Sequence, residues 1–381
     1  MSPPRLAIFL PSLAGGGAER MMINLAAGTL AEGVAVDLVC ADARGPYLSQ
    51  IPPGCRLVDL KASRTLSALP KLATWLRRRP PTALLAAMDH ANLVAIWARQ
   101  LARVRPSVRL AVSVRSQLSV AAANEPSLRG RALPWLARQF YPRADTIIAV
   151  SDGVADDLVS CLGLSRTQVA VIPNPVVSDD IEALANEPLE HPWFAPGAPP
   201  VLLAAGRLTT QKAFPTLLRA FARLVPERDL RLMILGEGPD RTALQAEIDA
   251  LGLGARVALP GFDPNPFRYL SRARLFVLSS AWEGLPGVLI QAMACGTPVV
   301  STDCPSGPRE VLENGRLGPL VPVGDAKALA AAIARTLEQP LPAATLKAGA
   351  VQYRLAPVSR RYLVALGLAN RDDPSAEVPV S

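Results

Sequence analysis

Aromatic residues, histidines and long apolar runs are scarce in this sequence of 381 residues, and each shortage excludes a class of protein. Aromatic residues make up 5% of the chain without any nucleic-acid recognition motif, so nucleic acid is not an expected partner. Half of the residues are hydrophobic, yet no run approaches the roughly 20 residues that span a bilayer. The five cysteines are odd in number and lack Cys-x-x-Cys spacing, which argues against a disulfide framework and a zinc site.

Three familiar nucleotide- and metal-binding motifs are also absent. The triple glycine at 15–17 resembles a dinucleotide-binding loop, but Glu19 and Arg20 stand where G-x-G-x-x-G needs its third glycine. We interpret it either as a loop that another molecule approaches closely or as a simple tight turn. No G-x-x-x-x-G-K-[ST] sequence occurs, which excludes a P-loop ATPase. No Asp-x-Asp pair, a motif that holds a divalent ion against a diphosphate, occurs either, so no metal ion is expected. We expect no other cofactor.

The N-terminus superficially resembles a secretion signal, because the apolar residues 6–10 follow Arg5. This apolar segment is too short for a signal peptide, and Pro11 and the following glycines interrupt it. The segment is therefore predicted to form a first strand, and the protein is expected to be cytoplasmic.

Strand-like and helix-like segments alternate along both halves of the chain. Strands are predicted at 5–11, 34–40, 56–60, 83–87, 110–114 and 146–150, and again at 201–205, 230–235, 257–259, 275–278, 299–301 and 320–321. Helical segments such as 66–79, 91–103 and 128–141 lie between them. This alternation is typical of parallel sheets joined by right-handed crossovers. We therefore predict an α/β protein with two parallel-sheet domains facing across a cleft, since ligands of such sheets bind beyond the carboxyl ends of the strands.

The domain boundaries follow from composition. Residues 1–177 are predicted to form the N-terminal domain, the proline-rich residues 178–199 a linker, and residues 200–355 the C-terminal domain. A final helix is expected within 356–370, and residues 371–381 have the composition of a disordered tail.

The most informative stretch joins the buried strand at 275–278 to a predicted helix at 288–295. Glu283 and Pro286 lie in the connecting turn. A helix N-terminus attracts anions, so a glutamate there is unusual unless it holds a hydroxyl-rich ligand. Gln291, inside the helix, offers both a donor and an acceptor. The stretch suits a phosphorylated sugar; the alternative is a capped surface helix whose Glu283 is merely solvated.

Two cations and one histidine are further candidates. Arg207 and Lys212 follow a strand and precede a helix, where they can reach a diphosphate, although from the residues alone ordinary surface charge is the favoured explanation. His90 lies where the strand at 83–87 meets a helix. Either His90 acts at the carboxyl edge of the sheet, or Asp89 and Asn92 cap the helix and His90 is a bystander.

Residues 283–300, Glu-Gly-Leu-Pro-Gly-Val-Leu-Ile-Gln-Ala-Met-Ala-Cys-Gly-Thr-Pro-Val-Val, resemble the signature of retaining family-4 glycosyltransferases of GT-B fold. That family usually carries a second glutamate where this chain has Gln291. Five other segments resemble the family in the same order, so that the resemblance covers nearly the whole chain. They are residues 15–20, 172–175, 206–212, 236–239 and 261–262.

The resemblance implies a GT-B architecture of two Rossmann-like domains and a retaining, metal-independent transfer from a nucleotide-sugar, with a UDP-sugar expected. The acceptor would be a glycan or a lipid-linked molecule of cell-surface polysaccharide synthesis, bound by the N-terminal domain. Glu283 and His90 would be catalytic, Gln291 would bind the ribose, and the final helix would pack back on the N-terminal domain. The remaining expected donor-binding residues are Gly16, Gly17, Asn174, Arg207, Lys212, Gly236, Phe262, Gly284, Leu285, Gly287 and Val288.

The formal net charge of +8 is unevenly spread. Between Arg64 and Arg143 the chain carries Lys71 and thirteen arginines in all, against only Asp89 and Glu125. One interpretation is solvated helix ends, since cations are favoured at helix C-termini. The other is a basic face that meets anionic lipid, which would make the protein peripheral on the cytoplasmic face of the inner membrane.

Two other functions remain open at this stage. A nucleotide-sugar epimerase of the same architecture would need acid and base residues, for which His90 and Asp89 are the candidates. A non-catalytic, degenerate transferase acting as a binding partner would explain the amide at Gln291.

Overall fold

The computed structural model describes residues 4–124 and 128–370, which fold into two compact units. Unit 1 joins Met1–Val176 to the C-terminal segment that begins at Gln352. Unit 2 is the continuous stretch Val177–Val351. The predicted disordered tail at 371–381 lies outside the described residues.

Unit 1 is built on a seven-stranded sheet with the order β3-β2-β1-β4-β5-β6-β7, and every ladder in it is parallel. Its strands are β1 (Arg5–Leu10), β2 (Ala35–Cys40), β3 (Arg56–Asp59), β4 (Ala83–Ala87), β5 (Arg109–Val114), β6 (Thr146–Ala149) and β7 (Val169–Val171). All five residues of β4 are buried, because this central strand is covered on both faces.

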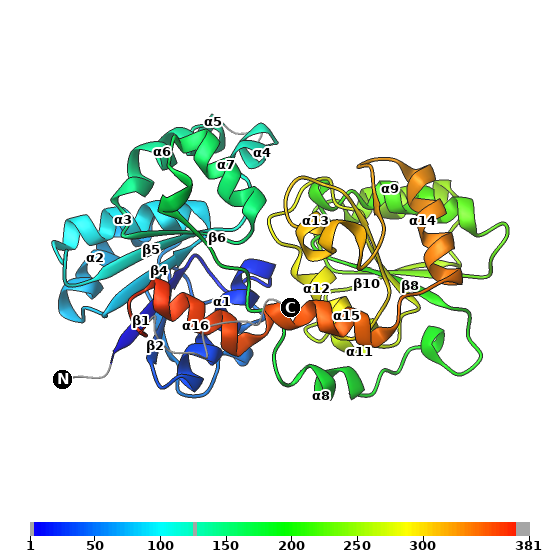
Figure 1. The fold of residues 1–381 in the computed structure, drawn as a ribbon, viewed down its shortest axis with the longest axis horizontal. Helices are drawn as coiled ribbons and strands as arrows, with labels where there is room; N and C mark the ends of the chain where they lie inside the picture. Colours follow the sequence, from blue (N-terminus) through cyan, green and yellow to red (C-terminus); the bar gives the residue numbers. More distant parts are fainter. Residues whose placement is uncertain (1–3, 125–127, 371–381) are drawn as a thin grey trace. The chain divides into compact units, whose positions relative to one another are not determined.

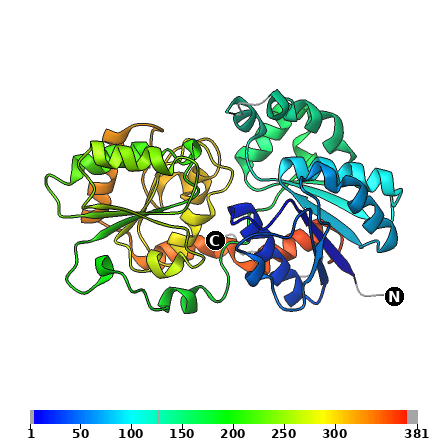
Figure 2. The same ribbon diagram turned by 180° about the vertical axis from the view of Figure 1, so that it is seen from behind.

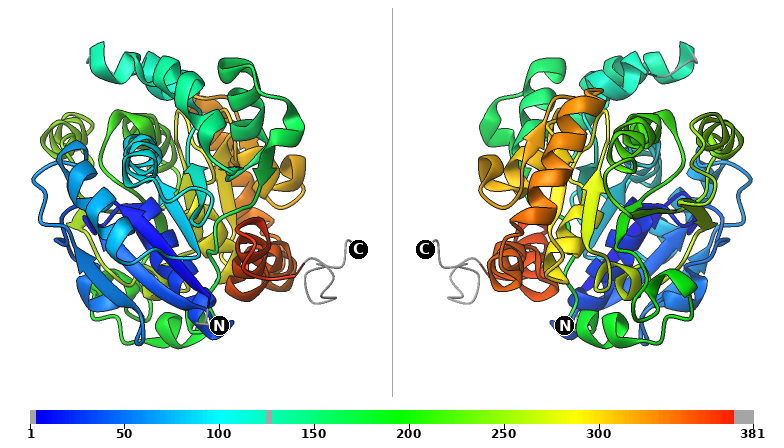
Figure 3. Two further views of the ribbon diagram at one scale, coloured as in Figure 1. Left: turned by 90° about the vertical axis from the view of Figure 1, so that its left-hand side faces the viewer. Right: turned by 90° about the vertical axis from the view of Figure 1, so that its right-hand side faces the viewer.

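Helices cover both faces of this sheet (Figure 1, Figure 2 and Figure 3). They are α1 (Gly17–Ala31), α2 (Leu69–Arg78), α3 (Asp89–Ala102), α4 (Leu118–Ala123), α5 (Leu128–Arg131), α6 (Leu133–Phe140), α7 (Asp152–Leu162) and α16 (Leu355–Ala365). The chain turns one way after β1 and the other way after β4, so right-handed crossovers put α1 and α3 on opposite faces.

The last helix, α16, packs along α1, as Figure 1 shows. Gly28 permits this close approach: a Cβ at that position would lie 2.0 Å from Ser359 Oγ and 2.8 Å from Ser359 Cβ. Val358, Tyr362 and Leu363 of α16 are buried. The C-terminal segment is therefore part of the core of unit 1.

Unit 2 is built on a six-stranded parallel sheet with the order β10-β9-β8-β11-β12-β13. Its strands are β8 (Val201–Ala205), β9 (Arg231–Leu235), β10 (Val257–Gly261), β11 (Leu275–Leu278), β12 (Val299–Thr302) and β13 (Leu320–Val321). Its helices are α8 (Ile181–Asn186), α9 (Phe214–Leu224), α10 (Arg241–Ala250), α11 (Phe267–Leu270), α12 (Gly287–Ala294), α13 (Pro308–Val311), α14 (Ala326–Glu338) and α15 (Ala343–Ala350). Among them, α14 packs on α9, and α15 packs on α12.

The proline-rich residues 178–199 contain α8, which packs on α11. Asn265 Nδ2 fastens this segment by donating to Leu184 O at 2.9 Å and to Glu187 Oε2 at 2.7 Å. The segment thus belongs to unit 2 in the structure.

Each sheet has one point at which the chain reverses its direction of winding. In unit 1 it lies between β1 and β4, and in unit 2 between β8 and β11. The loops that leave adjacent strands on opposite sides diverge there, which leaves room for a ligand at the carboxyl edge.

Among residues 4–124 and 128–370, no helix is both long enough and apolar enough to cross a membrane.

The contact between α1 and α16 gives a first prediction. Replacing Gly28 by alanine should destabilise unit 1, because the new methyl group would overlap Ser359. Overpacking typically costs about 1–3 kcal/mol, whereas alanine is otherwise better than glycine in a helix by about 1 kcal/mol. We expect Gly28→Ala to lower the melting temperature in differential scanning calorimetry. The double variant with Ser359→Gly should recover part of the loss.

Gly17→Ala is the matched control, because a Cβ at the first residue of α1 would meet nothing within 4 Å. A Gly28→Ala protein that melts at or above the wild-type temperature would mean that α1 and α16 do not pack this closely.

Candidate functional site

The loop between β8 and α9 brings Lys212 to the carboxyl edge of the sheet of unit 2. After Gly206 the chain makes a short 3-10 turn over Thr210–Lys212, and Ala213 enters the left-handed region (φ +45°) before α9 begins at Phe214. Pro215 in the first turn suits a helix start, because its missing N–H has no partner to lose there. The loop therefore ends with the lysine directly before the helix.

The loop between β11 and α12 brings Glu283 to the same edge. Glu283 is only 6% exposed, so the interpretation of this glutamate as a solvated surface residue is wrong. Its carboxylate Oε1 accepts hydrogen bonds from Ser280 Oγ at 2.6 Å and from Lys212 Nζ at 2.5 Å. The Glu283 N–H donates to Pro305 O, in the loop after β12. A buried carboxylate is thus held by a serine, a lysine and a neighbouring loop.

The ion pair between Lys212 and Glu283 crosses the point between β8 and β11 where the winding reverses. The side chains are 15% and 8% exposed, so both charges are largely removed from water. Such a pair is a weak source of stability, because desolvation offsets most of the attraction. It nevertheless holds one cation and one anion in fixed positions at the edge where α/β proteins bind ligands.

Backbone and amide bonds join the same two loops. Gln211 Nε2 donates to Trp282 O at 3.0 Å, and the Ala281 N–H donates to Gln211 O at 2.8 Å. Ser279 Oγ donates to Lys212 O at 2.8 Å. These three bonds fix the loop after β8 against the loop after β11, and so they position the ion pair.

Gly236 allows the loops after β8 and β9 to meet. Its φ of +137° is in the region that favours glycine, and a Cβ there would lie 2.0 Å from Gly206 O. The Gly206 N–H donates to Leu235 O and the Leu208 N–H donates to Glu237 O, both at 2.9 Å. The backbones of the two loops therefore contact each other directly at this part of the edge.

The remaining predicted residues of unit 2 surround this framework. Gly284 and Leu285 are buried in the loop before α12, Gly287 and Val288 open that helix, and Gln291 inside it is 9% exposed. Arg207 is exposed in the loop after β8, and Phe262, directly after β10, is 40% exposed. The structure thus gathers the predicted donor-binding residues of unit 2 at one sheet edge.

A thiol at the same edge is not a nucleophile. Burial and, to a smaller extent, the nearby Glu283 raise the pKa of Cys304 to about 12, against the opposing effect of Lys212. The thiol stays protonated at neutral pH, and a protonated thiol is a poor nucleophile.

Gly16, Gly17, His90 and Asn174 belong to unit 1, where all four lie at or near the carboxyl edge of its sheet. Gly16 precedes α1, and a Cβ there would lie 2.4 Å from Glu19 Oε2, so the buried carboxylate of Glu19 folds back over the glycine loop. Asn174 follows β7 and is buried.

His90 is the second residue of α3 and is exposed. Partial burial lowers its pKa, which keeps the imidazole neutral at neutral pH. Helix α3 starts at Asp89 after Met88, which has an unusual φ of +82° and makes no side-chain capping bond. Asp89 and Asn92 are therefore not caps of this helix.

Asp89 is a partly buried acid. Burial raises its pKa to about 6, and a hydrogen bond from the Tyr141 hydroxyl, 3.3 Å from Oδ1, counteracts part of that rise. Tyr141 is itself held by Asn92 Nδ2 at 3.3 Å.

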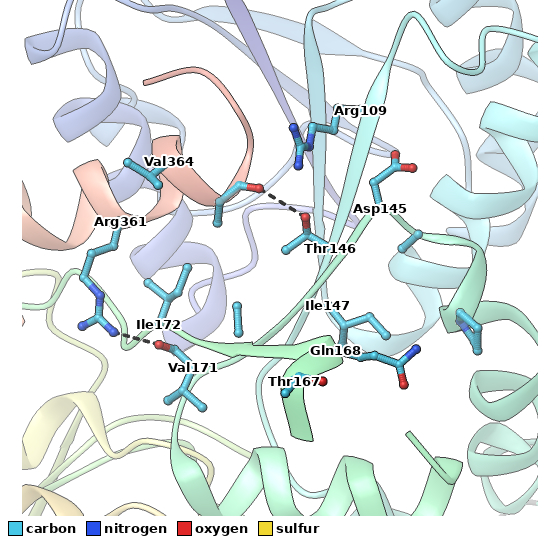
Figure 4. Close-up of a pocket in the computed structure, with 14 residues that line it drawn as sticks. Arg109, Asp145, Thr146, Ile147, Thr167, Gln168, Val171, Ile172, Arg361 and Val364 are labelled. Atoms are coloured by element: carbon cyan, nitrogen blue, oxygen red, sulfur yellow. Dashed lines mark hydrogen bonds between the residues drawn. The ribbon is translucent and has the colours of Figure 1, made fainter. Parts of the chain in front are cut away.

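A groove of about 610 Å³ also opens in unit 1, at the amino ends of β5 and β6 and beside α16 (Figure 4). Beside the groove, the Arg361 guanidinium donates to Val171 O at 2.8 Å, and the Thr146 hydroxyl donates to Ala365 O at 3.2 Å. Figure 4 marks both bonds with dashed lines. None of the predicted site residues lines this groove.

In the part of the chain that the structure describes, no three His, Cys, Asp or Glu side chains are grouped so that they could hold a metal ion.

Solved structures of other proteins identify the fold. The apo form of the lipopolysaccharide outer core galactosyltransferase WaaB superposes with a TM-score of 0.68 at 22% identity, over 95% of this chain and 99% of that one. Anabaena HepE in complex with UDP-glucose gives a TM-score of 0.76 at 21% identity, over 96% of this chain and 100% of that one. The fold is GT-B, with two parallel-sheet α/β domains of seven and six strands.

Sequence comparisons identify the family. Residues 15–180 match the model described as Glycosyltransferase Family 4, and residues 199–339 match the one described as Glycosyl transferases group 1. The N-acetylgalactosamine-N,N'-diacetylbacillosaminyl-diphospho-undecaprenol 4-alpha-N-acetylgalactosaminyltransferase of Campylobacter jejuni is 30% identical over 345 residues, 88% of this chain and 90% of that protein. The chain belongs to the family-4 glycosyltransferases, and the protein is a glycosyltransferase.

The ion pair gives the second prediction. Lys212→Met and Glu283→Gln should each destabilise unit 2, because each leaves the partner buried without its counter-charge. We expect each single change to cost on the order of 2–3 kcal/mol in urea unfolding, since part of each charge remains solvated. The double variant should lose less free energy of unfolding than the two single variants together, and the difference, the coupling energy, should be about 1–3 kcal/mol.

Arg219 and Glu247 form the matched control, because their contact at 3.2 Å is a more exposed pair in the same unit. Arg219→Met with Glu247→Gln should show coupling below about 1 kcal/mol. If the losses of Lys212→Met and Glu283→Gln simply add up in the double variant, the two side chains do not interact in solution.

Proposed function

We propose that this glycosyltransferase is a retaining, metal-independent enzyme that transfers a sugar from a UDP-sugar to a glycan or lipid-linked acceptor in cell-surface polysaccharide synthesis. The observation that carries the proposal is the buried pair of Lys212 and Glu283 at the carboxyl edge of unit 2. A UDP-sugar is favoured because Anabaena HepE, of the same fold, was solved with UDP-glucose. The acceptor class follows the name of the Campylobacter jejuni relative, which acts on a sugar diphospho-undecaprenol.

In this proposal, unit 2 binds the donor. Lys212 keeps two of its three N–H donors available beyond the bond to Glu283, and Arg207 extends from the same loop, so both cations can meet the diphosphate. The second oxygen of Glu283 accepts hydroxyl groups of the transferred sugar. Gln291 bonds the ribose through its amide, and Gly236, where the loops after β8 and β9 meet, contacts the nucleotide through its backbone.

The proposed reaction breaks the bond between the anomeric carbon of the sugar and the diphosphate oxygen. The acceptor hydroxyl attacks from the same face, and its proton passes to an oxygen of the leaving diphosphate. Arg207 and Lys212 stabilise the charge that develops on that leaving group, the task that metal-dependent transferases give to a divalent ion. Glu283 orients the sugar, and the neutral imidazole of His90 offers a further hydrogen bond to a substrate hydroxyl.

Unit 1 would bind the acceptor, and its residues Gly16, Gly17 and Asn174 are proposed to bind the donor. The epimerase and the non-catalytic interpretation are not favoured, because the similar proteins reported above are named as transferases.

A basic surface of unit 1 supports peripheral association with the cytoplasmic face of the inner membrane. Trp135 on α6 is 63% exposed. Arg131, which precedes Trp135 by about one helical turn, and Arg138, which follows it by about one turn, are exposed as well. Between Pro126 and Ala144 the sequence has four arginines and no acidic residue. Indole rings favour the bilayer interface, and each basic side chain near an anionic surface contributes about 1 kcal/mol.

The third prediction tests the transfer reaction. A thermal-shift panel of UDP-, GDP- and ADP-sugars should show stabilisation by a UDP-sugar, about 2.7 kcal/mol at 100 times its dissociation constant. With that donor, a glycan or lipid-linked acceptor and EDTA present, the wild type should release UDP and form a product whose anomeric configuration is retained by NMR. Glu283→Gln should slow the turnover by about 100-fold or more, because the sugar loses a charged hydrogen-bond partner.

Glu247→Gln, on the remote helix α10, should leave turnover unchanged. Wild-type rates in Glu283→Gln would exclude the role of this carboxylate. Activity that EDTA abolishes and Mg²⁺ restores would exclude the metal-independent mechanism.

The fourth prediction tests the membrane surface by vesicle flotation. The protein should float with vesicles that contain phosphatidylglycerol, not with pure phosphatidylcholine, and binding should fall with salt because screening acts within about 10 Å at 0.1 M. Trp135→Ala and the reversal of Arg77, Arg78 and Arg79 to glutamate should each weaken binding. Reversing Arg223, Lys327 and Arg335 of unit 2 is the charge-matched control. If the two triple variants lose vesicle binding to the same extent, the attraction depends only on the net charge of the protein and not on a basic surface of unit 1.

A further inference from the structure

The groove beside α16 is large enough to hold a small molecule. Its volume of about 610 Å³ lies within the range of roughly 300–1,000 Å³ that is usual for small-molecule sites. All of its lining residues belong to unit 1, and none of them takes part in the transfer reaction proposed above. The groove is therefore distinct from the sheet edge at which unit 2 is expected to bind the donor.

Apolar side chains line the middle of this groove, and one arginine lies towards each end. Ile147 of β6, Ile172 directly after β7 and Val364 of α16 supply the apolar surface. Arg361 contacts β7, whereas Arg109 begins β5, and β6 lies between these two strands. In the view of Figure 4, Ile172 accordingly lies between Arg361 and Arg109. Two strand spacings, each about 4.8 Å, separate β5 from β7.

Arg361 on α16 is a half-buried cation with a single hydrogen bond. Its Nη2 donates to Val171 O at 2.8 Å, which uses only one of the five N–H donors of a guanidinium. Its other nitrogens form no hydrogen bond or ion pair among the described residues, yet they are not enclosed by protein. Burial lowers the pKa of Arg361, because no counter-charge offsets the loss of water around it. Arg361 therefore keeps donors available to a molecule in the groove.

Arg109 lies against the other end of the groove. A Cβ at Gly367 would lie 2.5 Å from Arg109 Nη1, so the guanidinium rests on the turn that follows α16. Cations are favoured at helix C-termini, which explains this position in part. The side chain nevertheless forms no hydrogen bond and no ion pair in the part of the chain that the structure describes. All of its N–H donors therefore remain available.

The lining of the groove has more donors than acceptors. Asp145 is the one acidic residue among the described lining residues. It accepts a hydrogen bond from Arg99 and lies 3.5 Å from Arg105 Nη2, so two other cations already neutralise it. Gln168 adds its amide Nε2, because its Oε1 already accepts the Ser165 N–H at 2.8 Å. Such a lining suits a ligand that brings negative charge.

We propose that this groove binds a small molecule with two anionic groups, carboxylates or phosphates, joined by an apolar segment. One group accepts hydrogen bonds from Arg109 and the other from Arg361, in the bidentate form that guanidinium groups favour. The joining segment lies on the apolar side chains between them. The ligand would fasten α16 to the sheet, and α16 completes the core of unit 1. This site does not depend on the proposed transfer reaction.

The fifth prediction uses two series of probes, straight-chain α,ω-dicarboxylates and α,ω-alkanediphosphonates with about four to ten carbons. Each is titrated by calorimetry into the full-length protein. At least one dianion should bind ten times more tightly than the monoanion of the same length, because only the dianion meets both arginines. Arg109→Gln and Arg361→Gln should each remove this tenfold advantage, and Arg109→Lys should keep part of it. Arg166→Gln is the matched control and should bind like wild type, because Arg166 is already paired with Asp152.

The two series distinguish the sources of the negative charge. Tighter binding of the diphosphonates identifies phosphate esters as the ligands, whereas tighter binding of the dicarboxylates identifies carboxylic acids, and either result supports the site. Equal binding of dianions and monoanions, or no binding by any dianion, overturns the inference. Loss of dianion binding in the presence of saturating UDP assigns the probe to the donor site and also overturns it.

Arg109→Gln keeps the test independent of folding, because Arg109 forms no bond within unit 1 that its loss would break. Unchanged dianion binding in Arg109→Gln overturns the two-arginine site. A merely structural role of Arg361 predicts that Arg361→Gln lowers the melting temperature and weakens dianions and monoanions by the same factor.

Discussion

One short ion pair, between Lys212 and Glu283, organises the candidate site of unit 2. The two side chains come from loops that leave adjacent strands in opposite directions, and those loops would diverge without a link between them. Serine hydroxyls, a glutamine amide and backbone bonds then reinforce that link. The two buried charges, which cost free energy to remove from water, are thereby held in fixed positions. In the proposed function, a bound donor forms its own hydrogen bonds to these two side chains.

Unit 1 repeats the geometry of unit 2 with different chemistry. Its reversal point has the glycine loop before α1 on one side and Asp89 with His90 on the other, and no lysine joins them across it among the described residues. The cation at this edge, Arg115, comes from the next strand along. Two halves of one architecture thus hold charge differently: unit 2 has a pair of lysine and glutamate, whereas in unit 1 Arg115 donates to Ser113 and lies next to Tyr362 and Glu19.

Sequence reasoning predicted the alternating strands and helices well, because strands such as β8 and β11 are apolar runs buried on both faces. It missed β7, since three residues give no periodic signal. The candidate residues Lys212 and Glu283 were predicted singly, but not their bond. They are 71 residues apart and meet only because β8 and β11 are neighbours in the sheet.

The packing of α16 on α1 has a consequence for how the protein is made. Unit 2 is continuous, whereas unit 1 needs a helix that the ribosome synthesises only after all of unit 2. At about 5–20 residues per second, that delay is on the order of ten to forty seconds, during which α1 lacks the helix that covers it. Unit 2 is then free to fold first, although it comes second in the sequence. A chain released early by the ribosome would lack α16, so that the face of α1 that α16 covers would be exposed to proteases and chaperones.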